Sequence, residues 1–272
     1  MIVEFFDVPG PEKSTLARPF GEAPRKRGYR TVLPLNNNPA VGPRLLDLGR
    51  RIWFIMLYFC RAPRQCLRVI AASRSVQPKL PYFLRHCPGL LYMCALQHQY
   101  RRRQDIVVLD QGVAQGVYSL ALLGPAASPA PSENVELLSG LLRALPKPDL
   151  LIKIDAAAGV LRERLNRRWE LDGRRRWPRS RLELLSRTDS RAVEDSMRLI
   201  LCIEEVVQCQ GWKTIRCCTT EAEPVAQAAE RLAQEVLSAE LTQGRVQLVP
   251  TEASAAVLMA GGTLGVGRRD RA

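Results

Sequence analysis

Short apolar runs alternate with longer segments of helical periodicity along most of the chain. Five runs have the length and the β-branched or aromatic content that favour strands. They lie at residues 2–6, 29–35, 105–110, 149–155 and 212–217. The run at 29–35 contains Pro34, which indicates an edge strand or an early end, because proline cannot donate to a sheet. The intervening segments then have to supply the helices that cover these strands.

The segments between the runs carry apolar residues at helical spacing. They lie at residues 43–73, 81–103, 156–169, 182–210 and 224–240, with a loop at 126–132. The first two segments together are long enough for two or three helices beside the sheet. Strands that alternate with helices are typical of βαβ units. The pattern therefore predicts an α/β fold, a three-layer sandwich with a mostly parallel central sheet.

The length of 272 residues fits one large domain, since domains commonly have roughly 100–200 residues. We place this domain at residues 1–240, because the periodicity fades beyond it and residues 241–272 have the composition of a flexible tail. The composition, 46% apolar and 25% charged, excludes collagen-like, fully disordered and disulfide-scaffold proteins. Eight scattered cysteines and only two histidines predict buried thiols rather than a metal site or disulfides.

No uninterrupted apolar stretch reaches the roughly 18 residues of a membrane span. The longest candidate, residues 52–60, is much shorter, and its aromatic side chains predict a place in the core. The first six residues contain Glu4 and lack the basic start of a signal peptide. We therefore expect a cytoplasmic protein without a membrane partner.

The turn after the first run carries the residues of a phosphate-binding loop. The apolar run is followed by a turn rich in Pro and Gly and then by Lys13, Ser14 and Thr15, which open a helix. In such loops, backbone N–H groups bind a polyphosphate, a lysine neutralises its outer phosphates, and a hydroxyl holds Mg²⁺. A plain strand-to-helix turn, in which Ser14 and Thr15 cap the helix, is the alternative.

This segment resembles the Walker A motif of P-loop kinases, in particular the thymidylate-kinase-like branch of the nucleoside monophosphate kinase family. Against the pattern G-x-x-x-x-G-K-[ST], Asp7 and Glu12 take the two glycine positions. Both add bulk and negative charge beside a polyanion, so we expect them to weaken nucleotide binding. The resemblance implies that ATP is bound by Pro9, Gly10, Lys13, Ser14 and Thr15.

A second stretch, VVLDQG at residues 107–112, resembles the strand of this family that ends in Asp-Arg, with Gln111 in place of the arginine. The resemblance implies that Asp110 contacts Mg²⁺, directly or through water, and that Gln111 contacts the acceptor. Gln115 and Ser119 follow on one helical face, where the family has further acceptor contacts. The alternative is that Asp110 only caps the next helix.

Arg164 and Arg168 lie one helical turn apart in a segment that resembles the strand and helix leading into the lid of this family. Residues 169–181 then resemble an arginine-bearing helical lid. Between residues 162 and 191, eleven arginines and five acidic residues give +6 of the total net charge of +13. Arginines stabilise a transferring phosphoryl group, although such runs are also common on solvated faces.

The resemblance implies ATP-dependent phosphoryl transfer to a small acceptor, a nucleotide or another hydroxyl or phosphate compound. The alternative is a degenerate P-loop module that binds nucleotide weakly or not at all, without catalysis. The sequence argues against a nucleic-acid partner, because only 6% of the residues are aromatic and no RNA- or DNA-binding motif accompanies the net positive charge. The acceptor and the oligomeric state stay open. The implied catalytic residues are Lys13, Asp110, Arg164 and Arg168, with ATP and with Mg²⁺ held by Ser14 and Asp110.

Overall fold

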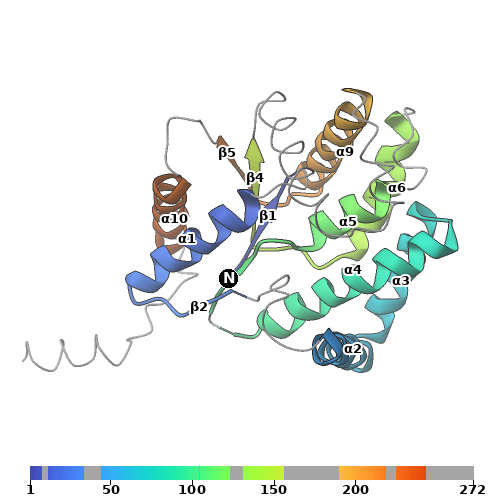
Figure 1. Ribbon diagram of the computed structural model, residues 1–272, viewed down its shortest axis with the longest axis horizontal. Helices are drawn as coiled ribbons and strands as arrows, with labels where there is room; N and C mark the ends of the chain where they lie inside the picture. Colours follow the sequence, from blue (N-terminus) through green and yellow to red (C-terminus); the bar gives the residue numbers. More distant parts are fainter. Residues whose placement is uncertain are drawn as a thin grey trace, which may run out of the picture.

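The computed structural model describes residues 1–7, 12–33, 44–103, 105–122, 131–155, 190–218 and 225–242. Within these ranges the strands form a five-stranded sheet in the order β2-β3-β1-β4-β5, and every neighbouring pair is parallel (Figure 1). The strands are β1 (Ile2–Phe6), β2 (Thr31–Val32), β3 (Ile106–Leu109), β4 (Leu150–Asp155) and β5 (Thr214–Cys218). All five overlap the predicted runs, so the predicted α/β class and parallel sheet are confirmed.

The central strand β1 lies between β3 and β4. Its Val3 pairs with Val108 of β3 on one side and with Leu150 of β4 on the other. All five residues of β1 are buried, as expected of a parallel strand with helices on both faces. Because the three strands run in the same direction, their carboxyl ends meet at one edge of the sheet.

Two helices, α1 (Glu12–Lys26) and α10 (Val225–Thr242), cover one face of the sheet and pack against each other. Leu16 and Phe20 of α1 pack on this face, and the ring of Phe20 meets that of Phe5 edge-on with 5.3 Å between the centroids. Leu232 and Val236 bring α10 into the same cluster. The first helix is thus fixed to the strand that precedes it.

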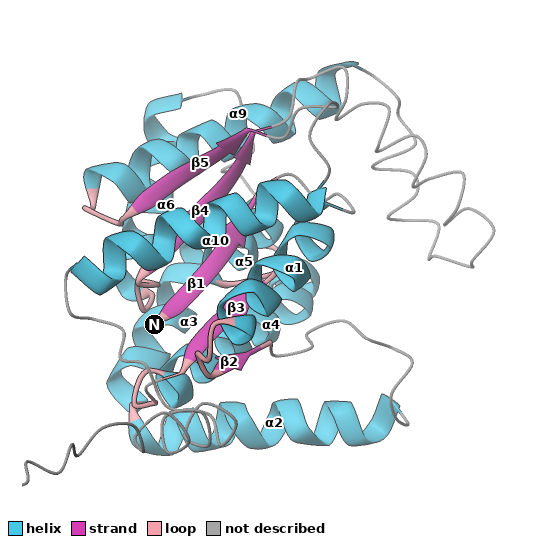
Figure 2. Cartoon of the chain, turned by 90° about the vertical axis from the view of Figure 1, so that its left-hand side faces the viewer, coloured by secondary structure: helices cyan, strands magenta, loops and turns pink. Residues whose placement is uncertain are grey.

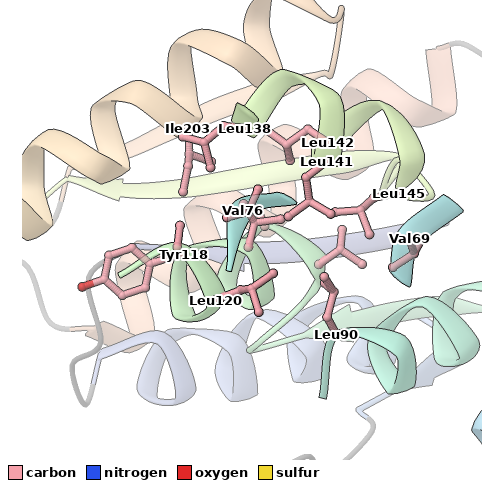
Figure 3. Close-up of a cluster of buried hydrophobic side chains, with 14 of the residues drawn as sticks. Val69, Val76, Leu90, Tyr118, Leu120, Leu138, Leu141, Leu142, Leu145 and Ile203 are labelled. Carbon is pink, nitrogen blue, oxygen red and sulfur yellow. The ribbon is translucent and has the colours of Figure 1, made fainter. Parts of the chain in front are cut away.

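The other face carries a thicker helical layer. It contains α3 (Pro63–Val76), α4 (Leu80–Tyr100), α5 (Val113–Ala121), α6 (Pro131–Ala144) and α9 (Ser190–Cys209). These helices share one apolar core with Phe6 and Leu151 of the sheet, and Figure 3 shows part of it around Leu120 and Leu141. Helices on both faces give the three layers that the sequence pattern predicts.

The helix α2 (Arg44–Arg61) lies at the outside of this layer, beside α4 (Figure 2). Its Tyr58 is buried, and its Phe54 meets Tyr92 of α4 edge-on with 6.1 Å between the ring centroids. Ile52 and Trp53, by contrast, are more than half exposed. The prediction that residues 52–60 belong to the core is therefore wrong for the outer side of this helix, because α2 packs on α4 and α3 through its inner side.

Two boundaries differ from the sequence pattern. The loop predicted at 126–132 overlaps the start of α6 at Pro131, since proline fits the first turn of a helix. The last helix continues to Thr242, two residues into the predicted tail. The helix predicted at 156–169, the lid at 169–181 and the rest of the tail lie outside the described residues.

Candidate functional site

The strand order places a topological switch between β1 and β3. The chain leaves β1 through α1 on one face of the sheet and leaves β3 through α5 on the other. Neighbouring strands whose following helices go to opposite faces mark the place, beyond their carboxyl ends, where ligands of open α/β sheets bind, and we call this part of the sheet edge the crevice. Lys13 and Ser14 follow β1 and Asp110 follows β3, so these residues lie there.

Lys13 is buried in the first turn of α1. Its Nζ donates a hydrogen bond to the backbone oxygen of Asp7, 3.0 Å away, so the side chain folds back over the start of the loop. Asp7 directly follows β1, and Lys13 is the second residue of α1. A cation is therefore held at the amino end of a helix that is aimed at the crevice, an arrangement that favours anions.

Ser14 joins the two strand ends. Its hydroxyl donates a hydrogen bond to Oδ2 of Asp110 over 2.9 Å, across 96 residues of sequence. The other carboxylate oxygen of Asp110, Oδ1, is buried and has no hydrogen-bond partner in the described part of the chain. Thr15, the next residue, is exposed. The structure thus brings Lys13, Ser14 and Asp110 together, as the sequence predicts.

The helix α5 carries the predicted acceptor residues. Gln115 is buried in its first turn, and its side-chain Oε1 has no hydrogen-bond partner among the described residues. The hydroxyl of Ser119 donates to the backbone oxygen of Gln115, 3.0 Å away, so Ser119 uses its polar group within the helix. Gln111 lies half-buried in the turn between β3 and α5. Gln115 therefore carries a buried acceptor atom that no described residue satisfies.

Glu4 is a site residue that the sequence analysis does not single out. It lies in the middle of β1, fully buried, and its Oε1 accepts a hydrogen bond of 2.6 Å from the backbone N–H of Ala114 at the start of α5. Its Oε2 accepts from Nε2 of Gln97 in α4 over 3.4 Å. Burial raises the pKa of this carboxyl to about 7, although the backbone donors of α5 act in the opposite direction.

The carboxyl of Glu4 also explains Gly112, which precedes α5. A Cβ on Gly112 would lie 2.1 Å from the carboxyl carbon of Glu4, far inside van der Waals contact. The backbone at the start of α5 therefore rests directly on this acid. A charged residue in the centre of an otherwise apolar buried strand is the sequence signal that could have identified it, because such a residue needs a specific partner.

A second buried ionic cluster lies at the carboxyl end of β4. The ammonium of Lys153 lies 2.5 Å from Oε2 of Glu204 in α9 and 3.1 Å from Oδ1 of Asp155. Arg216 of β5 donates to Oε1 of Glu204 over 2.7 Å. Lys153 and Glu204 are both buried. The cluster fixes α9 to two strand ends and neutralises its own charges.

Several predicted residues cannot be placed. Pro9, Gly10, Arg164 and Arg168 lie outside the described residues, as does the predicted lid. Glu12 begins α1, but its side chain is not among those described. Whether the arginines face the crevice stays a prediction.

The oxygen atoms at the crevice fit Mg²⁺. In the described ranges no group of three or more His, Cys, Asp or Glu residues could hold a metal by itself. Mg²⁺ does not need such a cage, because it keeps several waters and is commonly bound by one or two carboxylates with substrate phosphates. The hydroxyl of Ser14 and the free oxygen of Asp110 are ligands of that kind.

The prediction of buried thiols is correct for Cys66, Cys87, Cys94 and Cys217 but wrong for Cys60 and Cys209, which are exposed. Burial raises the pKa of Cys66 to about 11 and that of Cys94 well above its usual range, so both thiols stay protonated near neutral pH. The cysteines whose side chains are described are free. Cys66, Cys87 and Cys94 pack as small apolar groups in the helical layer, and Cys217 packs on the other face of the sheet.

Comparison of the chain with protein-family models and with curated proteins finds no match. No helix in the described ranges combines the length and the apolar composition that crossing a bilayer requires.

Proposed function

We propose that this chain is a P-loop kinase of the thymidylate-kinase-like kind, which transfers the γ-phosphoryl group of ATP to a small acceptor. The observation that carries the proposal is the hydrogen bond from Ser14 to Asp110 at the switch between β1 and β3. A hydroxyl after a lysine at a helix start, linked to the carboxylate that ends the neighbouring strand, is what shared Mg²⁺ binding in phosphoryl transfer requires.

In this proposal each residue at the crevice has a role in a single displacement. The acceptor oxygen attacks the γ-phosphorus while the bond to the β–γ bridging oxygen breaks, ADP leaves with the bonding electrons, and a hydroxyl acceptor passes its proton to the Asp110 carboxylate. Lys13 moves from the Asp7 carbonyl to the outer phosphates, and Asp110 and Gln115 orient the acceptor. Bound Mg²⁺ would neutralise charge on the phosphates. Arg164 and Arg168 are proposed to stabilise the transferring group.

Nucleotide binding is the first test. Isothermal titration with ATP and Mg²⁺ should give a dissociation constant that Lys13→Ala raises at least tenfold, because the buried ammonium is lost from the crevice. Lys26→Ala, at the exposed carboxyl end of the same helix, is the matched control and should leave the constant unchanged. Equal effects of the two substitutions would contradict the assignment of Lys13.

A catalytic test follows from the residues at α5. With radiolabelled ATP and a panel of nucleoside monophosphates, nucleosides and small alcohols, at least one acceptor should be labelled. Gln115→Ala should then raise the KM of that acceptor more than the KM of ATP, since Gln115 lies on α5 and not in the loop. A change in the ATP constant alone would place Gln115 elsewhere.

The second candidate function, a degenerate module without catalysis, is favoured by Asp7 and Glu12 at the two glycine positions of the motif. Under this alternative ATP binds weakly or not at all. Asp7→Gly with Glu12→Gly should then strengthen ATP binding, because bulk and negative charge are removed beside the phosphates. If neither this double variant nor the natural chain binds ATP, both candidates fail.

A further inference from the structure

The outer side of α2 is an apolar stripe on the surface. Its large apolar side chains are between 40% and 66% exposed, although the helix is held to the protein by its inner side. Four of them, Leu48, Ile52, Met56 and Phe59, recur three or four residues apart, so they lie along one side of the helix, and Trp53 lies at the edge of that side. The stripe, which we call the α2 face, consists of Leu48, Ile52, Trp53, Met56 and Phe59.

The inner side of the same helix accounts for its folding. Tyr58 is buried and stacks on His98 of α4 with 5.3 Å between the ring centroids, and Arg51 lies over the ring of Tyr92. Phe54 and Ile55 pack against the helical core. Because these contacts hold α2 in place, the α2 face is not needed for the fold, and its composition calls for another explanation.

The charge around the α2 face is strongly one-sided. Residues 44–103, which contain α2, α3 and α4, hold eleven arginines and one lysine against a single acidic residue, Asp47. Their net charge of +11 compares with +13 for the whole chain. The exposed arginines that flank the stripe or follow it at the start of α3 are Arg50, Arg61, Arg64 and Arg68.

We propose that the α2 face docks on a bilayer surface that contains acidic phospholipids. The apolar side chains would enter the boundary between headgroups and acyl chains, with α2 parallel to the bilayer, and the flanking arginines would bind lipid phosphates. An amphipathic helix with Trp and Phe on one side and arginines at its margins has the composition of such surface helices. Each cation near an anionic surface adds to binding.

This docking differs from a membrane span. The expectation that the protein has no membrane partner rested on the lack of a long apolar segment, and the described helices do lack one. A helix that lies in the interface needs only one apolar side. The inference is independent of the proposed kinase activity.

Charge also argues against other occupants of the α2 face. Two copies of this chain joined through α2 would bring two units of +11 together, and like charges repel. Nucleic acids bind through cations and stacked aromatics. The α2 face has two aromatic residues, but its other three, Leu48, Ile52 and Met56, offer aliphatic surface that bases and phosphates do not use. A bilayer with acidic lipids matches both the apolar stripe and its cationic margins.

The test is vesicle flotation of the full chain at two salt concentrations. Vesicles of phosphatidylcholine with 30% phosphatidylglycerol, a composition chosen to resemble an anionic bilayer, should bind at least tenfold more protein than vesicles of phosphatidylcholine alone. The triple variant Ile52→Ser, Trp53→Ser, Met56→Ser should reduce this binding at least tenfold. Leu201→Ser, at a similarly exposed apolar residue of α9, is the matched control and should retain it.

Substitution of the arginines and the emission of tryptophan distinguish a bilayer from the other possible partners of the α2 face. Arg61→Gln, Arg64→Gln and Arg68→Gln together should weaken binding to acidic vesicles at least tenfold, whereas Arg25→Gln with Arg27→Gln, at the carboxyl end of α1 and directly after it, should not. The emission of Trp53 should shift to the blue on vesicle binding, and Trp53→Phe should remove the shift while leaving binding measurable.

Three results would overturn the proposal. The first is that the natural chain does not bind acidic vesicles, or binds them equally well after the triple serine substitution. Sedimentation equilibrium that shows a dimer abolished by that variant, without vesicle binding, would assign the α2 face to a second copy. Salt-sensitive binding of an oligonucleotide that the variant removes, again without vesicle binding, would assign it to nucleic acid.

Discussion

Charged side chains are placed differently at the crevice edge of the sheet and in residues 44–103, the α2–α4 region. At the crevice edge, Lys13, Glu4, Lys153 and Glu204 are all buried, and each has a hydrogen bond or ion pair within the protein. In the α2–α4 region, cations gather on the surface beside exposed apolar side chains, with one acidic residue to offset them.

This difference distinguishes residues that the fold needs for stability from residues that it does not need. A buried charge is tolerated only with partners, so substitutions at the crevice edge should change stability strongly. An exposed apolar or cationic side chain contributes little to folding, so substitutions on the α2 face should leave stability unchanged while removing any docking. The predictions below test this contrast, beginning with the largest expected effect.

Gly112→Ala should lower the free energy of unfolding by about 4 kcal/mol, at the upper end for overpacked sites. The new methyl group would overlap the carboxyl of Glu4, which donors from α4 and α5 hold in place. Urea denaturation measures the loss. Gly140→Ala in α6, where an added Cβ meets nothing within 4 Å, should instead be neutral or stabilising.

A companion variant distinguishes the overlap from other causes. If Glu4 is the obstacle, Glu4→Ala should reduce the cost of Gly112→Ala in a double-mutant cycle, since the methyl group then has room. Additive effects of the two substitutions would show that Gly112 is needed for another reason.

Glu204→Gln should lower the free energy of unfolding by about 3 kcal/mol, because it removes the charge that pairs with buried Lys153. Asp155 keeps part of the pairing, which limits the loss. Glu205→Gln, the exposed neighbour on α9, should change stability by less than about 0.5 kcal/mol. A similar loss for both would indicate a helix effect rather than the buried pair.

Glu4→Gln should remove a pH dependence of stability. The unfolded carboxyl ionises near its usual pKa of 4.5, whereas the folded carboxyl keeps its proton up to about 7. Rising pH therefore favours the unfolded state, and the natural chain should lose about 2 kcal/mol more than the variant between about pH 5 and 6.5. Urea denaturation across this range measures it, and parallel pH profiles would contradict the raised pKa.

Trp53→Ser should have the smallest effect, less than about 0.5 kcal/mol in solution, because the side chain is 66% exposed. Tyr58→Ser, five residues along on the inner side, should cost about 3 kcal/mol, since it removes a buried ring between α2 and α4. Thermal and urea unfolding of the two variants provide the comparison. A large loss with Trp53→Ser would mean that the α2 face is part of the core.

The strands, and the proximity of Ser14 to Asp110, could be predicted because their signals are local. The runs at residues 2–6, 105–110 and 149–155 are short and apolar, and the residues that follow the first two are those that meet at the crevice. Strand order could not be derived from such runs. It depends on pairing between distant segments, such as Val3 with Val108.

The sequence did not predict on which side of a helix or strand certain residues lie. Residues 52–60 are apolar on nearly all sides, so periodicity cannot distinguish an outer from an inner side. The role of Glu4 could not be predicted, because a five-residue run with a single acid still has the pattern of a strand. Only the three-dimensional structure brings Gly112, Ala114 and Gln97 around it.

The helix α4 contacts both regions. Gln97 reaches the carboxyl of Glu4, and the very next residue, His98, meets the ring of Tyr58 on α2. These two contacts point from one turn of a 21-residue helix toward opposite neighbours. A shift of α2 that carries α4 with it would therefore change the packing around Glu4, on which the first turn of α5 rests.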